Sequence, residues 1–117
     1  MARDPRPRLD DILRSIEWIE QDIKGKTFDA FVRDRRLRQL LERNLEIVSE
    51  ASRHIPERMK AKHPGIPWRE IAAIGNVLRH EYGGTDPLIL WDAARADLKA
   101  LKTAVRRMRR ALDREKG

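Results

Sequence analysis

The stretch IGNVLRHEYGGTDP, Ile74 to Pro87, contains the end of one helix and the start of another within a few residues. Gly83 suits the position just after a helix, because a residue without a side chain adopts positive φ at little cost. Asp86 followed by Pro87 is typical of a helix start, with a side-chain cap and then a proline in the first turn. The stretch therefore predicts two helices joined by a tight turn, with polar residues gathered where the first helix ends.

Apolar residues recur at three- and four-residue steps through the rest of the chain, and no segment shows sustained alternation of strand type. This periodicity predicts an all-α fold, an antiparallel helical bundle of four main helices with short extra helices. The main helices are expected near residues 9–23, 35–54, 68–82 and 91–112, with short ones after Thr27 and Pro56. The residues expected to face the core are Leu9, Ile12, Leu13, Ile16, Ile19, Ile23, Phe28, Phe31, Leu37, Leu40, Leu41, Leu45, Val48, Ala51, Ile55, Ile71, Ile74, Leu78, Trp91, Ala94, Leu98, Leu101, Val105, Met108 and Leu112.

Local signals place the ends of these helices and leave some apolar residues outside the helical stripes. Asp10 and Asp11 are expected in the first turn of the first helix, where the helix dipole favours carboxylates. Lys24–Lys26, with its central glycine, is expected to end that helix. Trp68, Leu88 and Leu90 fall outside the expected core positions and are candidates for contacts with another chain.

Length and composition restrict the class of protein. The chain of 117 residues fits one domain, residues 1–117, and carries a formal charge of +7 with an isoelectric point near 10.4. That charge favours a polyphosphate or acidic partner, although a solvated basic surface without a specific ligand is an equal alternative. The absence of cysteine excludes disulfides and thiolate chemistry. No apolar run is long enough to span a membrane and no signal peptide is evident, so the expected location is the cytoplasm.

Three polar residues near the end of the third main helix form the candidate site. Asn76 and His80 are four residues apart and therefore share a helical face, and Tyr82 follows two residues later. Histidine suits proton transfer, because its ordinary pKa lies near neutral pH. Taken alone, however, a histidine near a helix end is more often a cap or surface residue, and a tyrosine is more often a packed aromatic.

The arrangement resembles the HepT-like branch of the HEPN superfamily, whose members include ribonuclease toxins of prokaryotic toxin–antitoxin pairs. Their motif is an arginine, usually followed by asparagine, and then His-x-Tyr near a helix end. Asn76, His80 and Tyr82 match this motif, and Thr85–Asp86 matches the turn that follows it. The resemblance extends through DRRLRQLLERNLEIVSEASRHI (34–55), HPGIPWREI (63–71) and LWDAARADLKAL (90–101), and so covers nearly the whole chain.

The resemblance implies a metal-independent endoribonuclease toxin, acting as a homodimer with the motif at a cleft between protomers. It also implies a minimal nucleotidyltransferase as antitoxin, which attaches AMP to Tyr82 and so regulates the site. The helix of residues 35–54 would border the cleft, so Glu46 or Glu50 would support the reacting residues. The same two carboxylates, with Arg43, are also explained as a solvated helix flank.

The sequence departs from the motif at its first position, where Gly75 replaces the arginine. Arginine suits phosphoryl chemistry because its planar group donates two hydrogen bonds to phosphate oxygens. Arg79 lies one turn after Gly75 and its side chain would project back towards the vacant position. Arg43, Arg69 or an arginine of a second protomer are the other sources of the missing cation.

Two hypotheses follow from this departure. The first is a ribonuclease in which His80, Arg79 and Asn76 do the chemistry on an RNA substrate. The second is a catalytically inactive relative that pairs with a nucleotidyltransferase or binds RNA. Neither requires a metal or another cofactor: the three histidines are scattered, and no glycine-rich phosphate loop follows a strand.

Overall fold

The computed structural model describes residues 4–80 and 86–116, with the side chains of Arg79, His80 and Lys116 outside that description. The helices are α1 (Arg6–Ile23), α2 (Phe28–Arg33), α3 (Arg35–Arg53), α4 (Glu57–Lys60), α5 (Trp68–His80), α6 (Pro87–Asp92), the π-helical turn η1 (Ala93–Asp97) and α7 (Leu98–Lys116). No strand occurs among the described residues. The predicted all-α fold, with four main helices and short extra ones, is confirmed.

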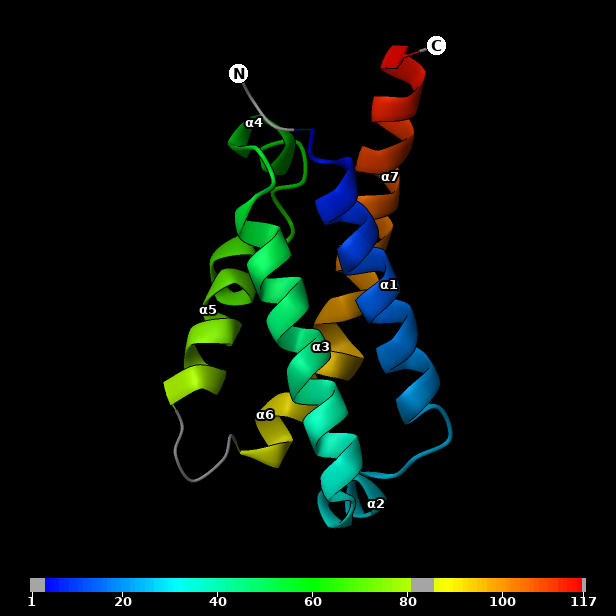
Figure 1. Cartoon of the computed structure of the whole chain (residues 1–117), viewed down its shortest axis with the longest axis vertical. Helices are drawn as coiled ribbons and strands as arrows, with labels where there is room; N and C mark the ends of the chain where they lie inside the picture. The colour runs from blue at the N-terminus through cyan, green and yellow to red at the C-terminus, as the bar shows by residue number, and fades with distance from the viewer. Residues whose placement is uncertain (1–3, 81–85, 117) are drawn as a thin grey trace.

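The long helices form a bundle with α3 at its centre (Figure 1). α3 packs against α1 on one side and α5 on the other, and α7 packs against α1. α2 and α6 lie at the lower end of the bundle in this view, and α4 lies at the upper end. α5 thus has α3 as its main neighbour, and its last turn points to the lower end.

The core is made almost entirely of the predicted apolar residues. Phe31 lies fully buried in it, and its ring centroid is 5.0 Å from that of Trp91. Two predictions were wrong: Leu40 is 51% exposed because it falls on the outer face of α3, and Leu90 is only 2% exposed. Leu90 belongs to the core because α6 begins immediately after Asp86 and turns its inner face onto α2 and α3. It is therefore not available for contacts with another chain.

α1 starts one turn earlier than predicted. Pro5 precedes the helix and Pro7 lies in its first turn, where a missing backbone N–H costs nothing. The first turn therefore contains no acidic residue, and the expectation for Asp10 and Asp11 was wrong. The predicted end is confirmed: Gly25 has a φ of 74°, which a glycine adopts without strain.

The predicted last helix is not regular. α6 continues through the π-helical turn η1 into α7, so one extra residue is accommodated before the regular seam of α7 begins. That seam is buried as predicted, with Leu101 and Val105 fully inaccessible to solvent. Among the described residues, no helix is long and apolar enough to cross a membrane.

Candidate functional site

α5 carries the motif, and its first turn is anchored to the preceding segment. α4 ends at Lys60, three residues earlier than expected, and the two prolines and the glycine within His63–Pro67 form the predicted break before α5. The indole N–H of Trp68 donates to the carbonyl oxygen of His63 at 3.1 Å, and the Lys60 ammonium lies 6.0 Å from the centroid of the Trp68 ring. Trp68 is therefore half-buried, and its indole already has partners within its own chain. The sequence suggested it instead as a contact for another chain.

Side chains of α3 bind directly to the backbone of α5. The Ser49 hydroxyl donates to the carbonyl oxygen of Ala72 at 2.9 Å and accepts from the backbone N–H of Gly75 at 3.0 Å. The Arg53 guanidinium donates to the same carbonyl, from Nε at 3.2 Å and from Nη2 at 2.8 Å. Ser49 is 1% exposed, so its own two bonds are shielded from water, whereas Arg53 is exposed. These bonds fix the rotation of α5 relative to α3 one turn before His80.

Gly75, at the position of the motif's arginine, lies in this contact and is buried. A glycine within a helix costs about 1 kcal/mol relative to alanine, so its presence calls for a compensating interaction. The Ser49 hydroxyl binds the backbone N–H of Gly75, and Gly75 is buried, so position 75 faces α3 in the contact between the two helices. The neighbouring Asn76 is exposed, so it lies on the outer side of the same turn.

The other motif residues are only partly described. α5 is described from Trp68 to His80, and its predicted end at Tyr82 and Gly83 lies outside the described residues, as do the side chains of Arg79 and His80. The restart after the turn is confirmed. The Asp86 carboxylate accepts from the backbone N–H of Leu88 at 2.9 Å and caps α6, and Pro87 lies in the first turn.

The candidate residues of α3 divide into two groups along the helix axis. α3 and α5 run antiparallel. Arg53 reaches only Ala72, whereas Ser49, one turn earlier on α3, also reaches Gly75, about one turn later on α5. His80 lies five residues beyond Gly75, about 7.5 Å along the axis, which is level with residues near Asn44 on α3. Arg43 and Glu46 are therefore at the level of the motif. They form an exposed ion pair at 3.7 Å, of the kind that contributes a few tenths of a kcal/mol.

Glu50 and Arg69 lie farther from the motif. Glu50 is within 3.2 Å of the His54 ring nitrogen and 3.9 Å of the Arg53 guanidinium. The hydrogen bond with His54 is the main reason why the pKa of Glu50 lies below its ordinary value. Arg69 is in the first turn of α5, eleven residues before His80, which corresponds to about 16 Å along the helix. Within one chain, the structure does not bring Arg69 to the motif.

Sequence reasoning missed two polar residues of this region, Ser49 and Asn44. Both are buried in α3, Ser49 against α5 and Asn44 with 7% of its surface exposed. The signal for Ser49 was its position four residues after Leu45, on the apolar stripe of α3. A serine within such a stripe indicates a buried hydroxyl that requires a partner. Arg53, the second side chain on Ala72, carries no comparable signal in the sequence.

An apolar pocket lies beside the motif, between α5 and α6. Its volume is 190 Å³, and its lining includes Ile74 and Val77 of α5 and Ile89 of α6. Val77 is 43% exposed and Ile89 is 57% exposed, and the adjoining Leu88 is exposed as well. Across residues 4–80 and 86–116, no three His, Asp or Glu side chains lie together as candidate metal ligands. The described surface next to the motif is thus an apolar pocket flanked by Asn76.

Comparison with known proteins identifies the family. Residues 12–108 match the family described as ribonuclease HepT-like. The chain is 37% identical over 110 residues to the "Probable ribonuclease HepT" of Thermococcus cleftensis, which covers 94% of this chain and 100% of the relative. It is 36% identical over 102 residues to "Putative RNase TTE0752" of Caldanaerobacter subterraneus subsp. tengcongensis, which covers 87% of this chain and 91% of the relative. No solved structure matches the chain. The matched region contains α2 to α6 and most of α1 and α7, and the chain belongs to the ribonuclease HepT-like family.

Proposed function

We propose that this protein is a metal-independent endoribonuclease of the cytoplasm, with its reacting centre at the C-terminal end of α5. The family match over residues 12–108, which includes the Asn76, His80 and Tyr82 motif, carries this proposal. Two relatives with the names of ribonucleases align over at least 91% of their own length, which supports an activity on RNA.

The proposed reaction needs a base and a cation. His80 takes the proton of a ribose 2′-OH, that oxygen attacks the adjacent phosphorus, and the 5′-oxygen leaves with a proton returned to it. Asn76 lies one turn before His80 on an exposed face of α5, where its amide can orient the imidazole. The cation that stabilises the charged phosphorane is assigned to Arg79, since Gly75 is buried against Ser49 and offers no side chain.

Cleavage of a single-stranded RNA by the purified chain in the presence of EDTA tests this proposal. His80→Ala should slow cleavage by at least about 10²-fold, the usual contribution of a positioned proton-transfer group. His63→Ala is the matched control and should cleave like the parent, because His63 lies at the opposite end of α5, before its first turn. Products ending in a 2′,3′-cyclic phosphate would identify the attack by the 2′-OH. Equal activity of parent and His80→Ala would contradict the assignment.

One observation favours a second candidate function, a binding protein without catalysis. The position of the motif's arginine is a buried packing position in this chain, held by the Ser49 hydroxyl at 3.0 Å. Such a protein would pair with a nucleotidyltransferase or bind RNA and leave it intact. A parent chain that binds RNA at low salt but cleaves none of it would decide for this candidate.

We further propose a homodimer with the motif at the cleft between protomers, and regulation by a minimal nucleotidyltransferase antitoxin that transfers AMP to Tyr82. An added phosphate next to His80 would repel the phosphates of the substrate and occupy the cleft without unfolding the chain. Mass spectrometry after co-expression with a candidate nucleotidyltransferase should find AMP on Tyr82. Modification confined to other residues would rule this mode of regulation out.

A further inference from the structure

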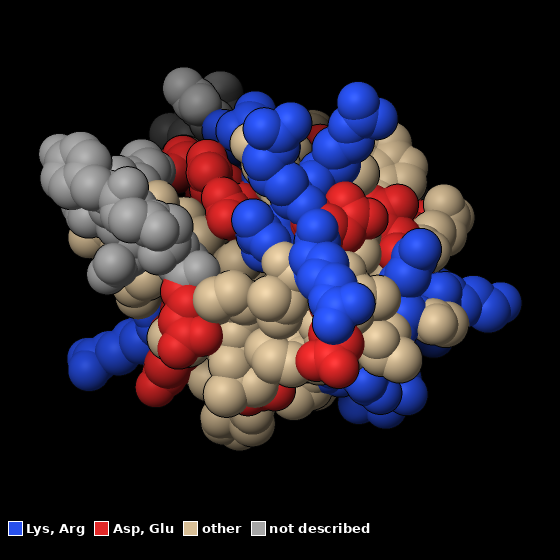
Figure 2. Space-filling view, turned by 90° about the horizontal axis from the view of Figure 1, so that it is seen from below, with Lys and Arg blue, Asp and Glu red and all other residues tan. Residues whose placement is uncertain are grey.

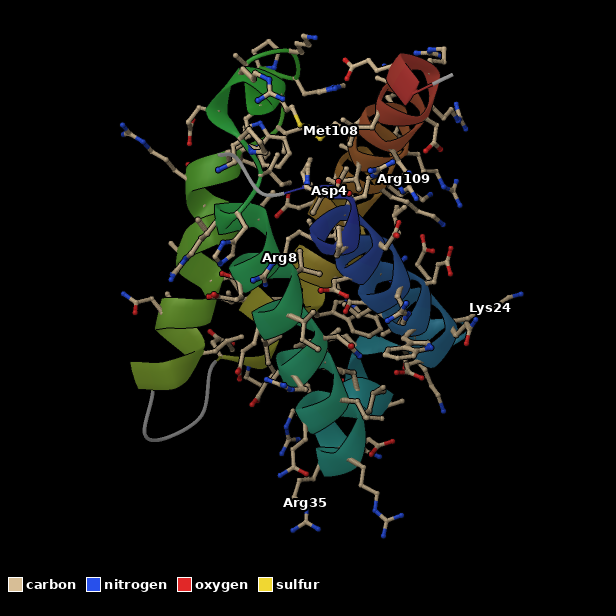
Figure 3. All side chains as sticks on the ribbon, turned by 45° about the horizontal axis from the view of Figure 1, so that its top comes forward. Asp4, Arg8, Lys24, Arg35, Met108 and Arg109 are labelled. Atoms are coloured by element: carbon tan, nitrogen blue, oxygen red, sulfur yellow. The ribbon has the colours of Figure 1, made fainter. Side chains whose placement is uncertain are left out.

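A second, larger groove lies away from the motif, between the end of α1 and the junction of η1 with α7. It has a volume of 780 Å³, within the usual range for ligand sites. Its lining includes the turn after α1 and the first residues of η1 and α7. Figure 3 shows Lys24 of this turn on the side of the bundle away from α5. The groove is therefore separate from the apolar pocket between α5 and α6.

The groove is strongly basic. Four cations line it, Lys24, Lys26, Arg95 and Lys99, and all four are exposed. None of them forms an ion pair within the described part of the chain, as the ion pairs of that part involve other cations. The only acidic residue of the lining is Glu20, and its carboxylate is 2.7 Å from the Lys102 ammonium. The groove thus presents four positive charges with its one negative charge already neutralised.

A turn in the backbone on one wall and a side-chain contact on the other place these cations around an open space. Gly25 has a φ of 74° between the two lysines of the turn, and a Cβ placed there would meet no atom within 4 Å. On the other wall, the Arg95 guanidinium lies 5.4 Å from the centroid of the Trp91 ring, at a distance typical of cation–π contact. Trp91 is itself buried against Phe31, so Arg95 stands on a fixed aromatic surface. Arg95 also belongs to the π-helical turn η1, and such turns are frequent at functional sites.

We propose that this groove holds the phosphate backbone of a single-stranded RNA. Proteins that bind single strands without sequence preference contact the phosphate backbone along a positively charged groove. Arginine next to an aromatic ring and lysines on a turn supply such contacts without reading the bases. Elsewhere on the lower end, Lys and Arg side chains alternate with carboxylates and uncharged surface (Figure 2), whereas the groove lining has one carboxylate, already paired.

The groove and the motif lie on different sides of the helix formed by α6 and η1. Ile89 and Ala93 of that helix face α5 in the apolar pocket, whereas Ala94 and Arg95 face α1 in the groove. An α-helix with its side chains is about 10–12 Å across, so one phosphate cannot occupy both places. The groove therefore binds nucleotides away from the cleaved bond. This step rests on the proposed function, since RNA is the substrate proposed there.

RNA binding measured without cleavage tests the groove separately from the reaction. The parent is the His80→Ala chain, and its affinity for a labelled polyuridylate oligonucleotide is measured by fluorescence anisotropy at several salt concentrations. Adding Lys24→Ala, Lys26→Ala and Lys99→Ala should weaken binding at low salt. It should also reduce the slope of log Kd against log salt by about 2, since each phosphate contact on a single strand contributes about 0.7.

The matched control removes three cations from the upper end, Arg58→Ala, Lys62→Ala and Arg114→Ala, in the same His80→Ala background. Its slope should stay within experimental error of the parent. Equal losses in the two triple variants would overturn the proposal, because they would reflect net charge alone. Unchanged RNA binding by the groove variant would overturn it too, even if that variant no longer associates with a co-expressed nucleotidyltransferase. No RNA binding by the parent would overturn it as well.

The outcome for the groove is independent of the outcome for catalysis. A wild-type chain that cleaves RNA, together with a groove variant that binds normally, would leave the ribonuclease in place and remove the groove. A wild-type chain that cleaves nothing, together with a groove variant that loses binding, would support the groove and contradict the ribonuclease. Circular dichroism of all variants should match the parent, because the substituted side chains are exposed.

Discussion

Arg79 is the residue on which the proposed chemistry most depends. It is next to His80 and one turn after Gly75, on the last turns of α5. Arg79→Ala should slow RNA cleavage by about 10²- to 10³-fold, the usual loss when a group that stabilises the charged transition state is removed. Steady-state cleavage rates of Arg79→Ala, Arg79→Lys and His80→Ala, compared with the parent, measure this. Arg79→Lys should retain part of the activity, because it keeps the charge but loses the paired donors.

Cleavage at the parental rate by Arg79→Ala would contradict this assignment. Attention would then move to Arg43, which lies level with the end of α5 and pairs with Glu46 only at 3.7 Å. Arg69 is a weaker alternative within one chain, because it lies at the opposite end of α5. It would have to come from a second protomer.

At the scale of single residues, the sequence correctly predicted roles that depend only on the neighbouring backbone, such as helix caps. Thr27 and Asp86 cap helices as expected, because an N-cap depends only on the next few residues. Ser49 and Asn44 were not predicted as buried, since their partners or surroundings come from other parts of the chain. The roles of His80 and Tyr82 remain predictions from the motif, because their side chains lie outside the described structure.

At the scale of helices, the contact between α3 and α5 decides what position 75 can hold. Gly75→Arg should lower the free energy of unfolding by about 1–3 kcal/mol, because a large side chain is added to a buried site. Urea denaturation followed by circular dichroism measures this. Ala100→Arg is the matched control: it adds the same side chain to an exposed position of α7, away from the pocket beside the motif, and should stay within about 0.5 kcal/mol of the parent.

The double variant Gly75→Arg with Arg79→Ala separates packing from catalysis at the same position. If the arginine of the motif can still be accommodated, this variant should be stable and active. The bonds from Ser49 to Gly75 and Ala72 predict the opposite, a destabilised chain without recovered activity. A stable and active double variant would show that the loss of arginine here is not enforced by packing.

Periodicity predicted the helices but not how they join. The repeat from Trp91 to Leu112 reads as one regular helix, because steps of three and four average close to one helical turn. The structure instead inserts the π-helical turn η1 between α6 and α7. A single extra residue barely changes the apolar pattern, so periodicity alone does not reveal it. Burial of Trp91 against Phe28 and Phe31 depends on contacts between distant segments, which explains why the turn was missed.

For the whole molecule, the structure shows where cations that contribute to the net charge of +7 lie, which composition alone did not show. Two carboxylates of α1 are paired with cations of α7 at the partly buried contact between these helices: Asp10 binds Arg109 at 3.0 Å and Glu20 binds Lys102 at 2.7 Å. The hydrogen bond with Asp10 is the main reason why the pKa of Arg109 lies above its ordinary value. The four cations of the groove form no ion pair within the described residues, so their charges face solvent.

The proposed dimer is tested by the apolar surface beside the motif. Val77 and Ile89 line the pocket there and are about half exposed, and Leu88 adjoins them. Sedimentation at micromolar concentration should give twice the chain mass of 13.7 kDa. Val77→Glu with Ile89→Glu should give a monomer, because each carboxylate would have to be buried without a partner in the interface.

Trp18→Glu with Leu40→Glu is the control for this variant. It changes two similarly exposed apolar residues on α1 and α3 and should leave the dimer intact. If the cleft between protomers is needed for cleavage, only the first variant should lose activity, and a parent that sediments as a monomer would exclude the dimer.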